Sequence, residues 1–242
     1  MSIEIFHALV FWLPAFLFST TVHEAAHAWA ARRGGDSTAA DAGLVTLSPL
    51  PHMARSPLGM VVVPVLTSFT HGVTLGWASA PFDREWADRH PRRAALMAAA
   101  GPAGNLAIAA AALLLIRIGL VVGWFEPPSQ VTLDRLVDAA GAAGAAGAVA
   151  NGGAADFFAH GLSVLAMLNV ILAVFNLLPL PPLDGASVVT LFLPEKLARR
   201  VAEVHRAPGL SFVGLVAAWQ LFPMLTRPLF ALVVTLLHPG LY

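Results

Sequence analysis

Apolar residues are concentrated in four long stretches, at about residues 4–31, 94–123, 157–182 and 209–237. A helix needs about 20 mostly apolar residues to cross the roughly 30 Å of hydrocarbon in a bilayer, and each stretch is at least that long. The pattern therefore predicts an all-α polytopic membrane protein with about four transmembrane helices. The last stretch contains three residues that interrupt an apolar helix, so we expect it to be kinked: Pro223, Arg227 and Pro228.

A fifth apolar stretch, about 57–77, is ambiguous. It contains Pro64 and three glycines, and its Val, Thr and Phe content favours a strand or a re-entrant segment. Basic residues flank it on both sides, namely Arg32, Arg33 and Arg55 before it and Arg84, Arg89, Arg92 and Arg93 after it. Since cytoplasmic loops are rich in Lys and Arg, a re-entrant segment that keeps both groups inside agrees with the positive-inside rule. The resulting topology has four spans and two external termini; five or six spans are the alternative.

The region between the second and third spans, about 124–155, is of low complexity, because residues 139–155 are almost entirely Ala and Gly. Such a segment buries too little apolar surface to form a domain, and we expect a flexible external loop. The sequence contains no repeat and no appended soluble region. We therefore interpret residues 1–242 as a single membrane-embedded domain, with its core at about 4–190 and a C-terminal kinked helix at about 209–237.

Composition agrees with this class and narrows the chemistry. The chain is 57% hydrophobic and 12% charged, with a mean hydropathy of +0.74, which is typical of an integral membrane protein. It has no cysteine, so a metal site would have to use His, Asp or Glu. The net charge is zero and no basic block is present, which argues against a nucleic-acid partner.

The first span contains the run His23-Glu24-Ala25-Ala26-His27 within otherwise apolar sequence. Two histidines four residues apart on a helix differ by about 40° in direction and by about 6 Å along the axis, so both imidazoles can reach one metal ion. Glu24 lies about 100° around the helix from His23, where its carboxylate can act on a water at that metal. Ionisable groups in a span each cost roughly 2.5–3.5 kcal/mol on insertion scales, and a bound cation would offset that cost.

The third span ends in a proline-rich run that leads to Asp184 and Gly185, with Pro179, Pro181 and Pro182 in between. Prolines break the helix at this depth and free backbone groups that protein, water or substrate must satisfy. In the four-span topology the first and third spans run in the same direction, so His23, His27 and Asp184 all lie toward cytoplasmic ends. Because they can share one depth, the sequence supports Asp184 as a third metal ligand.

Three motifs occur in a fixed order in the spans: His23-Glu-x-x-His27, then Gly101-Pro-x-x-Asn105, then Asn176-x-x-Pro179 followed by Leu183-Asp-Gly185. In these motifs the chain resembles the site-2 proteases, the M50 family of intramembrane zinc metalloproteases, over about residues 10–190. The resemblance implies a catalytic core there, with one Zn²⁺ held by His23, His27 and Asp184. It also implies that Glu24 is the general base and acid of peptide hydrolysis.

The same resemblance implies that Asn105 and Asn176 lie near the site and position substrate or donate to the oxyanion. Hydrogen bonding between helices, with no substrate role, is the alternative for both residues. Many members of the family carry PDZ or CBS domains, which this sequence does not show, so it resembles the compact subgroup without them. The family's re-entrant β element suits the region of about 36–80 and would offer an edge to an unwound substrate.

The leading hypothesis is an intramembrane zinc endopeptidase that hydrolyses peptide bonds in or near transmembrane segments of other proteins, as in regulated intramembrane proteolysis. Its partners would be a transmembrane substrate and the lipid bilayer, and its location a prokaryotic cell membrane. Two alternatives come from other classes, a metal-binding membrane transporter and a catalytically silent membrane scaffold. A transporter needs no general base, so the role of Glu24 separates these hypotheses.

Overall fold

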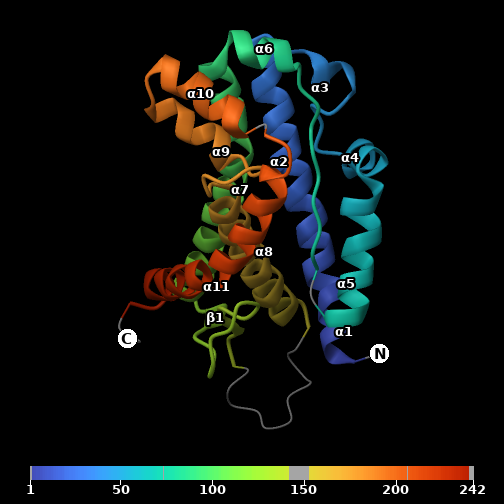
Figure 1. Cartoon of the computed structure of the whole chain (residues 1–242). Coiled ribbons are helices and arrows are strands. Elements are labelled where there is room, and N and C mark those ends of the chain that lie inside the picture. Colours follow the sequence, from blue (N-terminus) through green and yellow to red (C-terminus); the bar gives the residue numbers. More distant parts are fainter. Residues whose placement is uncertain (1, 73, 142–152, 206, 240–242) are drawn as a thin grey trace.

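The structure, a computed structural model, describes residues 2–72, 74–141, 153–205 and 207–239. Within these residues four helical segments are long and apolar enough to cross a membrane, and they form the body of the molecule (Figure 1). The first is a continuous run of α1 (Ile3–His7), η1 (Ala8–Trp12) and α2 (Leu13–Gly34), and the others are α7 (Pro91–Val121), α8 (Ala154–Asn176) and α11 (Leu210–Leu237). The prediction of a mostly helical protein with four helices of membrane-spanning length is confirmed.

The third of these helices is shorter than predicted. The apolar pattern extends to about residue 182, but α8 ends at Asn176, before Pro179. A proline has no backbone N–H to donate and disfavours helical geometry in the residue before it, so the proline cluster unwinds the chain. The segment from Leu177 to Leu183 consists of turns, and it delivers the chain to the short helix α9 (Gly185–Val188).

Short helices gather at one end of the bundle, and the two ends of the described chain lie at the other (Figure 1). The first group comprises α3 (Thr38–Asp41), α4 (Pro49–Arg55), α6 (Arg84–Arg89), α9, the 3₁₀ turn η3 (Val189–Phe192) and α10 (Glu195–His205). Together with the adjoining ends of α2 and α7, this group carries most of the chain's basic residues, ten of 14 within the described part of the chain. The positive-inside rule associates such a concentration of basic residues with cytoplasmic loops.

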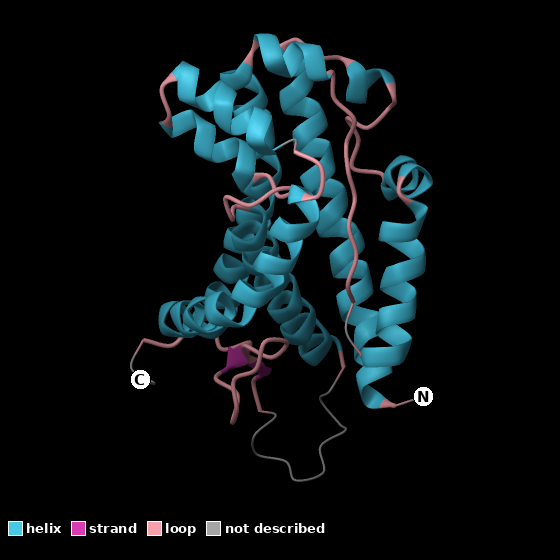
Figure 2. Ribbon diagram, viewed as in Figure 1, coloured by secondary structure: helices cyan, strands magenta, loops and turns pink. Residues whose placement is uncertain are grey.

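The ambiguous stretch at about 57–77 is a hairpin of a helix and an extended segment. η2 (Leu58–Val62) and α5 (Val63–His71) run away from the α6 end, and residues 74–82 return beside α2 in extended conformation (Figures 1 and 2). None of the described residues from 36 to 80 is in a strand, so the strand interpretation is wrong for this stretch. β-Propensity requires a pairing partner, whereas a helix satisfies its own backbone.

Helix α7 lies at the centre of the bundle and packs against both α2 and α8. Its buried positions are mostly small residues, including Ala95, Ala98 and Gly101, which let neighbouring backbones approach closely. Toward the termini, Ile116 packs in an apolar cluster with Leu136 and Met167. Many large apolar side chains of the four helices are exposed, as expected of surfaces that face lipid, among them Leu114, Leu115, Phe212 and Trp219.

Helix α11 contains Pro223 and Pro228 and changes direction along its length, between its orange-red first part and its dark red last part (Figure 1). An internal proline removes a helical hydrogen bond and is a common cause of such a bend. Beyond the prolines, the Arg117 Nη1 of α7 donates a hydrogen bond to the Leu237 carbonyl at 3.0 Å. This contact ties the C-terminal end of α11 to the central helix.

The chain between α7 and α8 has a structured first half. β1 (Phe125–Glu126) pairs antiparallel with β2 (Asp138–Ala139), and Leu136 and Val137 are fully buried against the bundle. Residues 142–152, which contain most of the Ala/Gly run predicted to form a flexible external loop, lie outside the described residues. The described half is therefore held to the bundle by a small sheet and apolar contacts.

Replacing Gly119 with Ala should destabilise this packing. A Cβ at Gly119 would collide with the ring of Phe125, whose Cγ would lie 3.1 Å away, and overpacking of this kind costs roughly 1–3 kcal/mol. We expect a lower thermal unfolding midpoint in detergent than that of the wild type. Gly161→Ala is the matched control, because the nearest atom to its Cβ would be at an ordinary 3.8 Å. Equal midpoints for the two variants would contradict the packing of β1 on α7.

Candidate metal centre

The residues of the first motif project from α2 into the interior of the bundle. His23, Glu24 and His27 are 7%, 5% and 8% exposed, so three ionisable side chains are buried in the middle of an apolar helix. The helix places them there because the face of α2 that carries them packs on α7 and α8. A buried ionisable group needs a partner, and the contacts of each side chain show what that partner is.

Hydrogen bonds on the far side of each ring orient the two imidazoles. His23 donates from Nδ1 to Oδ1 of Asn105 at 2.6 Å, and His27 donates from Nδ1 to the Met97 carbonyl at 2.8 Å. With Nδ1 protonated, a neutral imidazole presents a lone pair at Nε2. The two Nε2 atoms lie only 2.9 Å apart, so their lone pairs repel each other unless a proton or a metal cation lies between them.

Asp184 faces the same point from the other side. Its Oδ2 lies 3.1 Å from the Nε2 of His23, and its Oδ1 lies 3.4 Å from the Nε2 of His27. Oδ2 is buried, and it has no hydrogen-bond partner among the described residues. The three side chains offer one ligand atom each within 4.8 Å of one another. The structure thus brings together the two histidines and the carboxylate that the sequence suggested as a ligand set.

Two glycines allow the loop that carries Asp184 to pack closely against α8 and α11. A Cβ on Gly185 would overlap the carbonyl groups of Leu177 and Leu178 at the end of α8, and a Cβ on Gly214 of α11 would overlap the Pro181 carbonyl. Only glycine allows these close approaches. In addition, the Asp184 carbonyl accepts hydrogen bonds from the amides of Ser187 and Val188. The carboxylate is therefore held in position by α8, α9 and α11 together.

Asn105 is completely buried and belongs to a network of polar groups behind His23. Its Nδ2 donates to Asn169 Oδ1 at 2.8 Å and to the Ser19 carbonyl at 3.4 Å. Asn169 in turn donates to Ser19 Oγ at 2.7 Å and to the Leu165 carbonyl at 2.8 Å. The network joins α2, α7 and α8, and Asn105 thus makes the hydrogen bonds between helices that were the alternative to a substrate role. It also fixes the orientation of the His23 ring, which the sequence analysis did not predict.

Gly101 is a second feature of α7 that the motif alone did not explain. A Cβ at this position would lie 2.6 Å from His23 Nε2 and would also overlap His27 Nε2. The absence of a side chain keeps open the space in front of both nitrogens. The sequence spacing could have indicated this, because Gly101 and Asn105 are four residues apart and therefore lie on the same face of α7, the face that meets α2.

A cavity of about 710 Å³ leads to this centre. Its wall includes His23, Glu24, His27 and Asp184, and apolar residues such as Phe16, Phe175 and Leu215 make up much of the rest. The extended segment Gly76–Phe82 forms one side of it. Asn176 also lies in the wall, where its Nδ2 donates to the Leu172 carbonyl at 2.9 Å, whereas Asn105 is not among the lining residues.

A second cavity of about 510 Å³ meets the first at Asp184 and lies toward α10. Met97, Leu183 and Asp184 line both cavities, and the second one also contacts polar side chains, including Asp88, Arg199 and Glu203. Two cavities therefore meet at Asp184, and the second one carries charged side chains in a wall that is otherwise largely apolar.

The donor set fits zinc. Two neutral imidazole nitrogens and a carboxylate oxygen match the three protein ligands of catalytic zinc sites, which keep a fourth position open. The Nδ1 donors to Asn105 and Met97 are the outer hydrogen bonds that metal-binding histidines usually make. The buried Oε2 of Glu24, which has no hydrogen-bond partner in the described part of the chain, adds a carboxylate to the wall of the same cavity.

Comparison with known proteins agrees with this chemistry. The family model described as peptidase family M50 matches residues 11–220, which include all three motifs. "Putative zinc metalloprotease YwhC" of Bacillus subtilis is 28% identical over 214 residues, which cover 86% of this chain and 83% of that protein. The similarity is thus to a protein of comparable length over most of both chains.

Two further relatives carry the name "Putative zinc metalloprotease Rip2". The protein from Mycolicibacterium smegmatis is 27% identical over 221 residues, 91% of this chain and 70% of that protein. The protein from Mycobacterium tuberculosis H37Rv is 30% identical over 190 residues, 78% of this chain and 60% of that protein. No solved structure matches the chain with comparable significance.

A Gly101→Ala variant should lose metal while remaining folded. The added methyl group would occupy the space in front of the two Nε2 atoms. Loss of a residue that hydrogen-bonds a metal ligand lowers metal affinity about 10–100-fold, and we expect zinc affinity to fall by at least this much. Metal content after equilibration with buffered zinc measures this. In Gly104→Ala, the nearest atoms would be 3.5 Å from the new Cβ, so this control should keep its metal. Unchanged zinc content in Gly101→Ala would contradict the proposed position of the ion.

Proposed function

Because the chain belongs to peptidase family M50, we propose that it is an intramembrane zinc endopeptidase that cleaves peptide bonds in or near transmembrane segments of other membrane proteins. The observation that carries the proposal is the convergence of His23, His27 and Asp184, with Glu24 beside them, at the meeting point of two cavities. The four apolar helices and the bacterial relatives support an integral protein of a prokaryotic membrane.

His23, His27 and Asp184 would hold the zinc ion. When bound, zinc supplies a Lewis acid for the scissile carbonyl and lowers the pKa of water enough for attack near neutral pH. The residues of the chain prepare this site in advance: Asn105 and Met97 keep both rings turned with Nε2 toward Asp184, and Gly101 keeps the space clear. The one-negative, two-neutral ligand set leaves net positive charge at the centre, which favours binding of a carbonyl oxygen.

Glu24 would move the protons of the reaction. Its carboxylate lies in the cavity wall next to the ligands, and its buried Oε2 is free to accept a proton from the attacking water. The same oxygen would then deliver the proton to the leaving amine, which must be protonated to depart. This division of roles needs the carboxylate close to the ligands without itself being one, as its place beside His23 allows.

The substrate would bind in the larger cavity as an unwound segment. A helical substrate hides its carbonyls in internal hydrogen bonds, so it must be extended before attack. The segment Gly76–Phe82 runs along the cavity in extended conformation, and Trp77 N is held by the Gly59 carbonyl at 3.0 Å. We propose that this segment offers its backbone to the substrate as a strand would. Asn176, in the wall beside Asp184, would contact the substrate, whereas Asn105 would act through His23.

The hairpin of η2, α5 and residues 74–82 would enter the membrane and return on the same side. α4 and the following helix are bent by 115° relative to each other, and the hairpin begins and ends near α4 and α6 at the basic end of the molecule. We therefore propose four spans and one re-entrant hairpin. In this arrangement the second cavity, with charged side chains in its wall near α10, would open toward the cytoplasm and supply water, while the larger cavity would face the bilayer.

Glu24→Gln should retain zinc and lose peptidase activity. Glutamine preserves the size of the side chain but cannot accept the proton, and general acid–base catalysis contributes roughly 10²–10⁴-fold to rate. The measurement is cleavage of a model transmembrane substrate in detergent or liposomes, together with zinc content. Glu85→Gln, at an exposed position of α6, is the control and should cleave at the wild-type rate.

The same variant separates the alternatives. A metal transporter that used His23, His27 and Asp184 as a transit site would keep its transport in Glu24→Gln, and a silent scaffold would show no cleavage in the wild type either. Full cleavage by Glu24→Gln would remove the proposed role of this carboxylate.

Single cysteines can test the topology, because the chain has none of its own. We expect Ala54→Cys and Glu85→Cys, which lie before and after the hairpin, to react with a membrane-impermeant thiol reagent from the same side. Ser129→Cys, in the β1–β2 region, should react from the opposite side. The measurement is labelling in sealed vesicles of known orientation. Labelling of residues 54 and 85 from opposite sides would show that the hairpin is a full span.

A further inference from the structure

A second group of potential ligands lies at the opposite end of the bundle from Asp184. It consists of His7 at the end of α1, Asp134 in the loop between β1 and β2, and His160 in α8. Each residue offers one ligand atom, and these atoms lie within 4.8 Å of one another. Apart from the centre described above, no other His, Asp or Glu group of three within the described residues meets this criterion.

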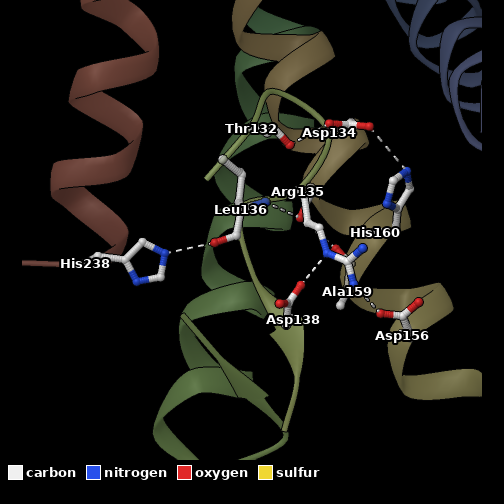
Figure 3. A network of polar contacts seen from close by, with 10 residues as sticks. Thr132, Asp134, Arg135, Leu136, Asp138, Asp156, Ala159, His160 and His238 are labelled. Carbon is white, nitrogen blue, oxygen red and sulfur yellow. Dashed lines mark hydrogen bonds and ion pairs between the residues drawn. The ribbon is translucent and has the colours of Figure 1, made fainter. Parts of the chain in front are cut away.

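His160 carries an unsatisfied polar atom. The residue is 6% exposed, and its buried Nε2 has no hydrogen-bond partner among the described residues. The nearest oppositely charged atom is Oδ2 of Asp134 at 3.9 Å, too far for a hydrogen bond but suitable for two groups that share a ligand (Figure 3). An imidazole nitrogen buried without a partner is costly, so the site calls for a ligand that can bind a nitrogen lone pair.

The loop holds Asp134 in an orientation that suits this role. Thr132 Oγ1 donates to Asp134 Oδ1 at 2.6 Å, which leaves Oδ2 directed at His160 (Figure 3). Thr132 and Arg135 also exchange backbone hydrogen bonds, at 3.0 and 3.2 Å, so the turn that presents the carboxylate is closed. One carboxylate oxygen bound by a hydroxyl group and the other aimed at an imidazole is a common arrangement around metal ligands.

The neighbouring cation is already neutralised. Arg135 would repel a metal ion, but its guanidinium forms ion pairs with Asp138 and, at 2.9 Å, with Asp156 (Figure 3). Burial lowers the pKa of Arg135, but the hydrogen bond and charge of Asp138 outweigh it and the net shift is upward. The carboxylates of Asp138 and Asp156 thus balance the guanidinium charge of Arg135. The Asp134 carboxylate can therefore interact with another cation.

His7 and His160 face each other within an aromatic surround. Their ring centroids are 4.8 Å apart, and Phe11 packs on His160 at 4.2 Å. Phe157 covers Phe11 from the other side at 5.0 Å. These rings exclude water from one side of the cluster and lower the local dielectric, which strengthens the attraction between a cation and Asp134.

We propose that His7, Asp134 and His160 form a second metal site, for a divalent transition ion such as Zn²⁺, at the end of the molecule opposite the peptidase centre. Two imidazoles and one carboxylate suit zinc, cobalt, nickel or copper, whereas calcium and magnesium prefer oxygen ligands alone. Ligand atoms of a tetrahedral zinc lie roughly 3.3 Å apart, so small side-chain rotations would close the present distances.

An ion there would join three separate parts of the chain. His7 belongs to the N-terminal helix, Asp134 to the loop that precedes α8, and His160 to α8 itself. Binding would fasten the first turns of the N-terminal span and the β1–β2 loop to α8, and it would stabilise the folded state by an amount that grows with the logarithm of the free metal concentration above the Kd. The proposal does not depend on the peptidase activity, because none of these residues lines the catalytic cavity.

The test counts metal ions in the full-length protein. The detergent-solubilised protein is stripped with a chelator, equilibrated with zinc chloride, and analysed for bound zinc per chain by mass spectrometry. We expect two ions in the wild type and one in a His23→Ala/His27→Ala variant, in which only the second site remains. Adding Asp134→Asn or His160→Gln to that variant should lower its zinc affinity by at least roughly tenfold.

A matched control lies in the same region. His238 is equally buried, but its Nε2 already donates to the Leu136 carbonyl at 2.9 Å (Figure 3). His238→Gln should therefore keep the second ion. Asp134→Asn in the otherwise wild-type protein should bind one zinc ion per chain instead of two. This measurement does not require the His23→Ala/His27→Ala variant to fold.

Two outcomes would overturn the proposal. One is the absence of zinc from a folded His23→Ala/His27→Ala variant, and the other is a loss of zinc in the control His238→Gln equal to that in Asp134→Asn. A parallel measurement uses calcium chloride instead of zinc chloride. Binding of calcium in place of zinc would refute the assignment to a transition metal. The result is different if only the proposed zinc site at His23, His27 and Asp184 is wrong. The wild type would then hold a single ion, and its binding would depend on Asp134 and not on His23.

Discussion

The approach of Asp184 to the two imidazoles of α2 constrains most of the bundle around it. The carboxylate can reach Nε2 of His23 and His27, at 3.1 and 3.4 Å, only if α8 stops before the site and the chain turns back. The proline cluster ends the helix, Gly185 lets the turn press on the end of α8, and Gly214 lets α11 close over it. Gly101 then leaves room for an ion between the groups. Each feature makes sense as a condition for this one contact.

Burial of polar groups in an apolar bundle imposes a second condition, which is that each group must have a partner. Asn105, Asn169 and Ser19 meet it by bonding to one another and to backbone carbonyls across three helices. The same bonds set the orientation of the His23 ring, so structural satisfaction and preparation of the metal ligands are achieved by one network. Two of the buried side-chain atoms without a hydrogen-bond partner among the described residues are Oε2 of Glu24 and Oδ2 of Asp184, and for these the peptidase proposal supplies a proton or a metal ion.

The two clusters of potential ligands lie at different ends of the spanning helices and in different surroundings. The centre at Asp184 opens into cavities that can admit an extended peptide and water. The group at His160 is packed among aromatic rings and lines neither of the two larger cavities, which suits a structural ion better than a catalytic one. The hairpin between α4 and α6 supplies the extended edge next to the first centre. Catalysis and stabilisation by metal would thus be separated along the membrane normal.

The sequence by itself determined the four long apolar helices, because a bilayer requires an uninterrupted apolar run of fixed length. It also singled out His23, Glu24 and His27, since their relation depends only on the local geometry of one helix. Tertiary structure decided the rest. Residues 58–71 form the helical elements η2 and α5, and none of the described residues pairs with them as a strand. Asn105 meets His23 from 82 residues away. His7, Asp134 and His160 come together from three elements. Contacts of this kind depend on how helices pack, which hydrophobic periodicity does not encode.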